Sequence, residues 1–281
     1  MEKRPYGKSG EMLSAVGFGG ILVSGETQED ANNYVAEAID KGVNYFDVAP
    51  TYGNAEERLG PALVGKRSKV FLACKSEKRT KSEVEKALEE SLKRLRTDHF
   101  DLYQLHSVST LEDVKAVLGP GGALEALVRA KEKGLIRHIG FSTHSEEAAI
   151  ELMNQFDFES VLFPLNWVCM LNGGFGQKII EEAQKKGVTM LALKAMAKTH
   201  WKDNTDRTYK KCWYEPIDDK ELAQLAFRYT LSKPITAAIT PGYMKFFRWA
   251  LEVVQGFKPL TKEEESFLLD KSQNLKPIFP Q

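Results

Sequence analysis

The sequence predicts an α/β fold, in which one (β/α)8 (TIM) barrel domain spans residues 1–281, with an N-terminal β-hairpin and a C-terminal helical extension. Three observations predict this fold. Short apolar runs alternate with long amphipathic stretches about eight times along the chain. Several amphipathic stretches end in lysine followed by glycine. The 281 residues also match the length of one α/β barrel.

The short apolar runs are the predicted strands. Their length and composition are typical of strands buried on both faces, and their alternation with helices implies a parallel sheet with right-handed crossovers. We expect strands at Val16–Gly20, Val43–Asp47, Val70–Lys75, Phe100–His106, Ile136–Ser142, Ser160–Leu165, Val188–Lys194 and Ile235–Thr240.

The amphipathic stretches are the predicted helices, because their apolar residues recur at spacings of three and four. Val84, Leu88, Leu92 and Leu95, for example, form one apolar stripe. We expect helices at Thr27–Lys41, Asn54–Val64, Thr80–Arg96, Gly122–Lys133, Ser145–Gln155, Gly176–Lys186 and Asp218–Leu231.

The ends of these helices carry recognisable signals. Thr27, Thr80, Ser145 and Asp218 have the side chains of N-caps. Glycines 42, 134 and 187 each follow a lysine, which suits the negative end of a helix dipole, and each can take the left-handed conformation that ends a helix.

An open dinucleotide-binding sheet is the alternative to a barrel. Such a sheet usually carries G-x-G-x-x-G after its first strand. The segment Gly17-Phe18-Gly19-Gly20 lacks the third glycine and the helix start that this pattern requires. The barrel is therefore favoured.

Three segments lie outside the repeating units. Arg4–Lys8 and Glu11–Ala15 flank Ser9-Gly10 and predict a hairpin that plugs the bottom of the barrel. Lys198–Pro216 is a long polar and aromatic loop, and a loop of this length in a compact domain is usually functional or disordered. The tail, Gly256–Gln281, contains one predicted helix, Lys262–Ser272, and is expected to pack across the barrel.

Composition excludes several classes of protein. Lys and Arg together equal Asp and Glu at 39 each, so the chain is a poor candidate for binding nucleic acid or an anionic membrane. The three cysteines are widely spaced and form neither a metal motif nor a disulfide framework, which fits a reducing compartment. With no apolar signal core at its N-terminus, the protein is expected to be cytoplasmic, metal-free, and a monomer or weak homo-oligomer.

Polar side chains end three consecutive predicted strands. Asp47 and the nearby Tyr52 follow one strand, Lys75 ends the next, and His106 ends the third. Active sites of these barrels lie at the C-terminal ends of the strands, and neighbouring strands are about 4.8 Å apart, so the four groups can converge. A lysine ammonium lowers the pKa of a phenol, and an aspartate orients the lysine. This set suits proton transfer to a carbonyl oxygen.

With these residues in view, FDVAPTYG, ACKS, LYQLHS and GLIRHIGFSTHS together resemble the aldo-keto reductase family, from the hairpin to about residue 255. The resemblance implies a (β/α)8 barrel that binds NADP(H) and reduces aldehydes or ketones to alcohols. The family's catalytic aspartate, tyrosine, lysine and histidine fall on Asp47, Tyr52, Lys75 and His106.

The resemblance also implies where NADP(H) binds. Ser142, with Thr143 in place of the family's asparagine, would hold the nicotinamide carboxamide, and Asn166 would replace a glutamine whose position is taken by Leu162. Lys245 and Arg248 share a helix face and would hold the 2′-phosphate, or they form a solvated face. The expected cofactor-binding residues are Gly19, Gly20, Ser142, Thr143, Asn166, Leu193, Lys194, Met196, Gly242, Lys245 and Arg248.

The favoured function is thus NADPH-dependent reduction of a small-molecule carbonyl substrate, with hydride from nicotinamide and a proton from Tyr52. The alternative is an NADP(H)-binding redox sensor on the same barrel with negligible turnover. A metal-dependent barrel hydrolase is a third possibility, although no cluster of metal-ligand character is evident.

Overall fold

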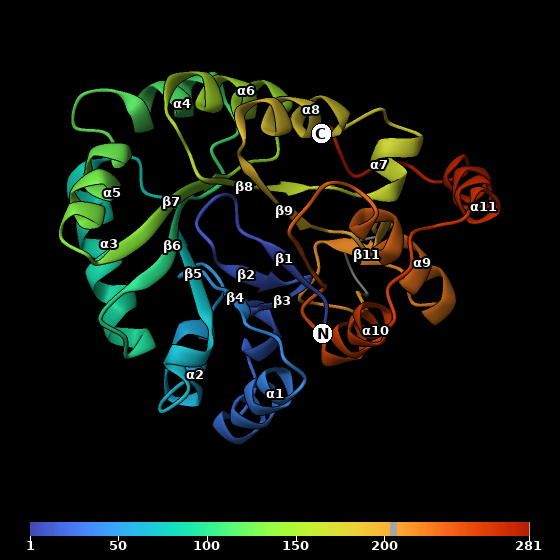
Figure 1. The fold of residues 1–281 in the computed structure, drawn as a ribbon, viewed down its shortest axis with the longest axis horizontal. Coiled ribbons are helices and arrows are strands. Elements are labelled where there is room, and N and C mark those ends of the chain that lie inside the picture. Colours follow the sequence, from blue (N-terminus) through green and yellow to red (C-terminus); the bar gives the residue numbers. More distant parts are fainter. Residues whose placement is uncertain (203–206, 281) are drawn as a thin grey trace.

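A computed structural model of the chain describes residues 1–202 and 207–280. Eight parallel strands close into a barrel, in which each strand pairs with the next and the last returns to the first (Figure 1). In barrel order the strands are β3 (Val16–Gly19), β4 (Tyr45–Asp47), β5 (Phe71–Ser76), β6 (Phe100–Leu105), β7 (Ile136–Ser142), β8 (Ser160–Pro164), β9 (Thr189–Leu193) and β12 (Ala237–Ile239). The predicted barrel is confirmed.

Alternate side chains of these strands fill the barrel, and the others face the helices. The interior cluster consists of Tyr6, Leu13, Tyr45, Phe71, Ala73, Leu102, Leu162, Leu191, Ala237 and Ile239. Gly17 has no room for a side chain, because an added Cβ would lie 2.5 Å from Cδ1 of Tyr45. The interior is therefore packed, and side chains of functional interest can project only at its open end.

The N-terminal hairpin closes the other end, as expected from the sequence. Its strands, β1 (Lys3–Pro5) and β2 (Met12–Ser14), pair antiparallel. Between them Tyr6 enters the barrel, and its hydroxyl donates to Oγ of Ser160 at 2.9 Å. The buried side chain of Leu13 joins the interior cluster.

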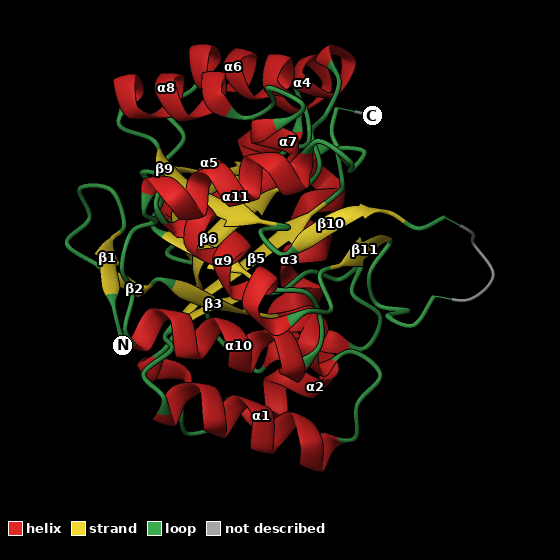
Figure 2. Cartoon of the chain, turned by 90° about the vertical axis from the view of Figure 1, so that its right-hand side faces the viewer, coloured by secondary structure: helices red, strands yellow, loops and turns green. Residues whose placement is uncertain are grey.

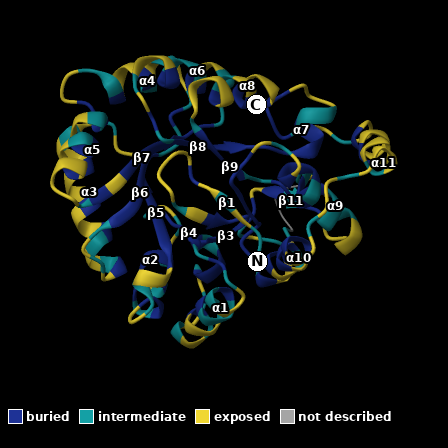
Figure 3. Cartoon of the chain, viewed as in Figure 1, coloured by how far each residue is buried: buried dark blue, intermediate teal, exposed yellow. Residues whose placement is uncertain are grey.

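Helices surround the barrel (Figure 1). Those that follow strands are α1 (Gln28–Asp40), α2 (Ala55–Ala62), α3 (Lys81–Leu95), α5 (Ala123–Glu132), α6 (Glu146–Gln155), α8 (Gln177–Lys186), α9 (Lys220–Leu231) and α10 (Met244–Gln255). Short 3-10 turns occur at η1 (Gly20–Val23) and η2 (Arg67–Lys69). Figure 3 shows the resulting pattern, with buried strands inside and exposed outer helix faces.

The predicted helix signals are mostly confirmed. Thr27 and Ser145 cap α1 and α6 through their side chains, and glycines 42, 134 and 187 are left-handed. Thr80 occupies the N-cap position of α3 without a side-chain hydrogen bond. The prediction for α9 is wrong by one residue: Asp219 caps the helix, because the Asp218 carboxylate is bound by Lys245 instead.

Several elements were not predicted. Helix α4 (Leu111–Leu118) and helix α7 (Trp167–Leu171) lie in segments for which no helix was predicted. The long segment after β9 contains an antiparallel pair, β10 (Ala197–His200) and β11 (Tyr214–Pro216), which projects from the barrel in Figure 2. Residues 203–206 of this segment lie outside the described residues.

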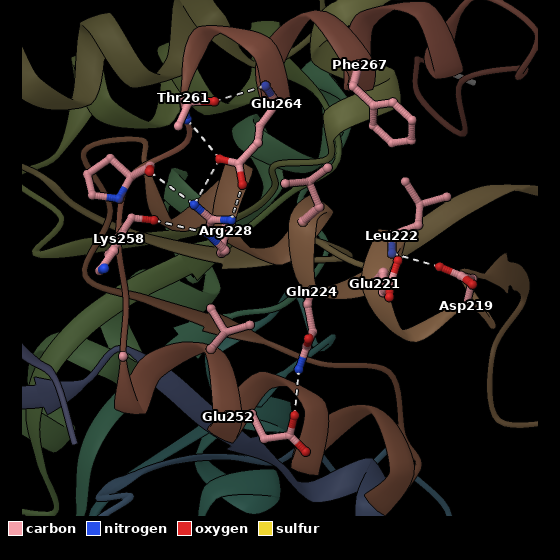
Figure 4. A pocket seen from close by; sticks show the side chains of 14 residues that line it. Asp219, Glu221, Leu222, Gln224, Arg228, Glu252, Lys258, Thr261, Glu264 and Phe267 are labelled. Atoms are coloured by element: carbon pink, nitrogen blue, oxygen red, sulfur yellow. Dashed lines mark hydrogen bonds and ion pairs between the residues drawn. The ribbon is translucent and has the colours of Figure 1, made fainter.

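The C-terminal extension packs against the barrel wall, as predicted. Its helix, α11 (Lys262–Ser272), has the predicted bounds and contacts α7 and α9. A surface groove of about 910 Å³ lies between α9, α10 and α11. Figure 4 shows Arg228 across its floor, paired with Glu264 and donating to the carbonyl groups of Lys258 and Pro259. These contacts tie the extension to the barrel.

Among the described residues, no helix combines the length and the apolar character that a membrane crossing requires.

Candidate active site

A pocket of about 370 Å³ opens at the C-terminal ends of the barrel strands. Asp47, Tyr52, Lys75 and His106 all line it. Strands β4, β5 and β6 bring these side chains to one place because they are neighbours in the barrel, with Asp47 opposite Ala73 and Lys75 opposite Gln104 in register. The structure therefore brings together the four residues that the sequence singled out.

Lys75 and Asp47 form a buried ion pair at the floor of the pocket. The amide of Gln104 donates to the second carboxylate oxygen of Asp47 at 3.0 Å. Burial alone would lower the pKa of Lys75, but the neighbouring Asp47 carboxylate and Tyr52 raise it above its ordinary value. Lys75 therefore stays a cation, held in place by Asp47, whose carboxylate is in turn oriented by Gln104.

Tyr52 lies beside this cation, with the Lys75 ammonium 5.2 Å from its ring centroid. Burial raises the pKa of the Tyr52 phenol, and the Lys75 charge and hydrogen bond offset only part of that rise. The sequence-based argument included the effect of the lysine but not the cost of burial. The net result is a phenol that carries its proton at neutral pH.

His106, directly after β6, faces Tyr52, with the two rings nearly perpendicular and their centroids 6.3 Å apart. Burial and the nearby Lys75 charge lower the pKa of His106 to about 2. Its Nδ1 atom is buried without a hydrogen-bond partner. Arg79 supports this corner from behind by donating to the carbonyl groups of His106 and Ser107 at 3.0 and 2.9 Å. A neutral imidazole thus lies beside the phenol ring.

Two residues with unusual backbone conformations line the same pocket. Ser107 has φ 56° and Lys194 has φ 65°. Among described residues other than glycine, only Arg96 at the end of α3 shares this left-handed conformation. Such backbone strain concentrates at functional sites because the surrounding structure must hold it in place.

Lys194 carries a charge that no carboxylate balances among the described residues. Its ammonium lies 5.5 Å from the ring centroid of Trp213. Burial and the Lys75 charge lower the pKa of Lys194 to about 8. The other pocket cations have acidic partners, Asp47 for Lys75 and Glu26 for Lys211. Lys194 is therefore suited to an anionic ligand.

Five of the expected cofactor-binding residues line the pocket, namely Gly19, Ser142, Leu193, Lys194 and Gly242. Gly242 leaves no space for a side chain, because an added Cβ would lie 2.8 Å from Cγ2 of Ile21. Thr240, beside it, has a buried hydroxyl with no hydrogen-bond partner. Close backbone approach, an unpaired hydroxyl and an unbalanced ammonium all fit a phosphate-bearing group such as a dinucleotide.

The other expected residues lie outside the pocket lining: Gly20, Thr143, Asn166, Met196, Lys245 and Arg248. The Asn166 side chain caps α7 and donates to the carbonyl groups of Lys194 and Ala197. Its amide therefore holds the backbone next to the pocket instead of facing it. Met196 is buried, and the Thr143 hydroxyl bonds to the backbone of Ser145.

The sequence argument missed two supporting residues. Gln104 orients Asp47, and its position two residues before His106 placed it on the same inward face of β6. Lys211 donates to Leu22 O at 3.3 Å and Glu26 Oε1 at 2.7 Å, which fastens the long loop across the pocket to the segment after β3. No local sequence signal marks this contact, because its partners are 185 or more positions away.

The described residues contain no group of three or more His, Cys, Asp or Glu side chains arranged to hold a metal ion. The pocket instead joins a protonated phenol, a buried lysine–aspartate pair and a neutral imidazole, and Lys194 lines the same pocket. Residues 15–253 match the model of the aldo/keto reductase family. The chain belongs to the aldo/keto reductase family. Membership implies reduction of carbonyl compounds with NAD(P)H, as the resemblance in the sequence predicted.

Relatives agree with this assignment. The chain is 27% identical to an uncharacterized oxidoreductase of Bacillus subtilis, YqkF, over 87% of this chain and 88% of that protein. It is 28% identical to a 6-dehydroglucose reductase of Novosphingobium aromaticivorans over 67% of each. A solved aldo-keto reductase from Bacillus halodurans superimposes with a TM-score of 0.74 at 22% identity, covering 99% of both chains, and shows the shared fold.

Proposed function

We propose that this aldo/keto reductase uses NADPH to reduce an aldehyde or ketone to an alcohol, with Tyr52 as the proton donor. The convergence of four side chains on one pocket carries the proposal, above all the protonated Tyr52 phenol beside the buried Lys75 cation. A phenol with a raised pKa is poised to give a proton, and a cation beside it stabilises the phenolate that remains.

Each residue then has a distinct part. The neutral His106 imidazole positions the carbonyl oxygen of the substrate near the Tyr52 hydroxyl, which donates its proton to that oxygen. Lys75 stabilises the phenolate, Asp47 holds Lys75, and Gln104 orients Asp47. The bound nicotinamide supplies the hydride.

The cofactor would be held by the chain's own donors at the pocket rim. Ser142 would meet the carboxamide, and Leu193 would pack against the ring. Lys194 and the backbone at Gly242 would bind the phosphates, since both face the pocket without an acidic partner. Lys245 and Arg248, at the start of α10, would bind the 2′-phosphate. The cytoplasmic location and the monomeric or weakly associated state stay predictions.

A tyrosine substitution tests the proposal. We expect Tyr52→Phe to lower kcat for reduction of 4-nitrobenzaldehyde by at least about a hundredfold, the scale of losing a positioned general acid. NADP+ affinity should stay close to that of wild type, because the phenol hydroxyl is not among the proposed cofactor contacts. The matched control is Tyr229→Phe, which changes a buried tyrosine of α9 outside the pocket.

Steady-state kinetics and fluorescence titration with NADP+ give the two readouts. Near-native turnover in Tyr52→Phe would contradict the proton-donor assignment. A wild type that binds NADP+ tightly but turns over none of a panel of aldehydes and ketones would favour the redox-sensing alternative.

A further inference from the structure

The two cations assigned to the 2′-phosphate are already bound by carboxylates of the same chain. Arg248 donates to Glu37 through two nitrogens, at 2.9 and 2.8 Å. Lys245 is paired with Asp218 and also donates to the Tyr209 hydroxyl at 3.0 Å. These contacts join α10 to α1 and to the end of the long loop.

Both pairs lie beside the pocket and open to solvent. Helix α10 begins at Met244, two residues after the pocket-lining Gly242, and runs alongside α1 in Figure 2. The Arg248 and Lys245 side chains are 53% and 43% exposed. A ligand phosphate can therefore reach these cations without any part of the core unfolding.

A carboxylate and a phosphate monoester both accept hydrogen bonds from a guanidinium or an ammonium through negatively charged oxygen atoms. Arg248 offers a planar pair of donors, which Glu37 occupies in bidentate fashion as a phosphate would. Lys245 offers a point charge that Asp218 already neutralises. Binding of a 2′-phosphate must displace these carboxylates, or must share the cations with two negative groups.

We propose that Glu37 and Asp218 are specificity-determining residues, internal counter-ions that compete with the 2′-phosphate of NADP(H) for Arg248 and Lys245. The inference rests on the proposed function. NAD(H) has hydroxyl groups at the same ribose and leaves both ion pairs intact. The two carboxylates therefore reduce the preference for NADP(H) below what the two cations would otherwise give, and they let NAD(H) bind as well.

Charge-neutralising variants test this competition. We expect Glu37→Gln and Asp218→Asn each to tighten NADP+ binding by about two- to fivefold, the scale of freeing a cation from an exposed ion pair. NAD+ binding should change less than twofold. The quantity to compare is the dissociation constant of NAD+ divided by that of NADP+, both measured by fluorescence titration at one ionic strength. A loosened loop would change both constants by the same factor and would leave this ratio unchanged.

Glu89→Gln is the matched control, since it removes one exposed carboxylate from an ion pair on α3, a helix on the opposite side of the barrel (Figure 1). It should leave the ratio unchanged. The inference is overturned if both dinucleotides bind but neither Glu37→Gln nor Asp218→Asn raises the ratio above that of Glu89→Gln. If wild type binds neither dinucleotide, the proposed function itself fails.

Discussion

At the scale of single residues, the site depends on two opposing effects on Tyr52. Burial raises the pKa of the phenol, whereas the Lys75 cation lowers it. Asp47 adds a smaller rise, yet its main effect is to keep Lys75 charged and in place. The phenol is thus protonated before reaction, and the phenolate formed by proton transfer is stabilised by a cation that is already oriented.

Removing the cation should reveal this balance. In the direction of alcohol oxidation the phenolate acts as the base, so the rate rises with pH toward the pKa of Tyr52. We expect Lys75→Met to lower the rate and to move this rise to higher pH, because only the effects that raise the pKa of the phenol remain. The measurement is kcat for alcohol oxidation between about pH 6 and 10.5.

Lys198→Met is a suitable control, because Lys198 pairs with Glu215 on β11 and does not line the pocket. An active Lys75→Met protein with an unshifted pH profile would remove the electrostatic role assigned to Lys75.

At the scale of elements, the long segment after β9 bridges the pocket. Cys212, Trp213 and Tyr214 line it, while Lys211 is fastened to Leu22 and Glu26 on its far side. Among the described residues, the acidic partner of Lys211 is Glu26, so this ion pair ties the two segments together. A dinucleotide bound beneath this bridge would be shielded from water.

Hydrogen exchange can follow this segment directly. We expect amides of the described part of Lys198–Pro216 to exchange more slowly when NADP+ is added, because the bound cofactor would hold the segment from below. Lys211→Met should reduce that protection, while peptides from α3 serve as an internal reference in both proteins. Equal exchange with and without saturating NADP+ would contradict the proposed covering role.

The N-terminal hairpin is held to the barrel floor by a histidine between two carboxylates. His138 contacts Glu11 of the hairpin through Nε2 at 2.6 Å and Glu159 through Nδ1 at 2.5 Å. Burial alone would lower the pKa of His138, but the two carboxylates outweigh burial and raise it. The pKa of Glu159 falls to about 2, because its contacts with His138 and Lys131 outweigh its burial.

The sign of the pH dependence follows from these shifts. Because the pKa of His138 is raised in the folded state, this group contributes its full stabilisation below its ordinary pKa of about 6.5. That contribution is lost as the pH rises through the folded-state pKa. Because the pKa of Glu159 is lowered in the folded state, this group contributes its stabilisation at a pH above its ordinary pKa. That contribution is lost as the pH falls toward about 2. The contact should therefore contribute most between about pH 4.5 and 6.5.

We expect His138→Gln to destabilise the protein by about 1–3 kcal/mol in that window, the scale of losing a hydrogen bond to a charged group. The difference from wild type should shrink as the pH rises above the window. Urea unfolding at several pH values from 5 to about 9 measures it. His99→Gln, a change at an exposed histidine paired with Asp98, is the control. A difference that is constant with pH would rule out an ionised His138.

At the scale of the whole molecule, the sequence predicted the barrel well because its signals are local. Each signal is contained within a few residues: a short apolar run for a strand, an apolar stripe for a helix, and a glycine after a lysine for a helix end. The repetition of these signals about eight times along the chain indicated the barrel. Helix α7 escaped prediction because its apolar residues continue those of β8, so no change of period marks its start. Helix α4 was missed although Thr110 caps it through its side chain.

The four polar residues could be predicted because adjacent parallel strands end at one rim. The balance of effects on the pKa of Tyr52 could not be predicted, because the burial that raises this pKa exists only in the folded barrel. The partners of the expected phosphate cations were also beyond local patterns: Glu37 and Arg248 are 211 positions apart. Contacts of this kind arise only when the barrel closes.

The two ends of the chain meet the barrel at opposite faces, which bears on whether residues 1–281 form one domain. The hairpin places Tyr6 in the barrel floor. The tail brings the buried Phe279 to the mouth, where its ring stacks on His144 at 5.0 Å and meets Trp213 edge-on at 5.7 Å. Both termini thus contribute to packing around the same strands, as a single cooperative unit requires.

We therefore expect one unfolding transition that both ends influence. Tyr6→Phe removes a buried hydrogen bond at the floor and Phe279→Ala removes a buried ring at the mouth, and each should lower the same Tm, by about 2–4 °C per kcal/mol lost. Far-ultraviolet circular dichroism and tryptophan fluorescence should report coincident transitions in both variants. If Phe279→Ala instead produces a separate early transition while the main Tm stays at the wild-type value, the C-terminal extension unfolds on its own and the prediction of one domain is wrong.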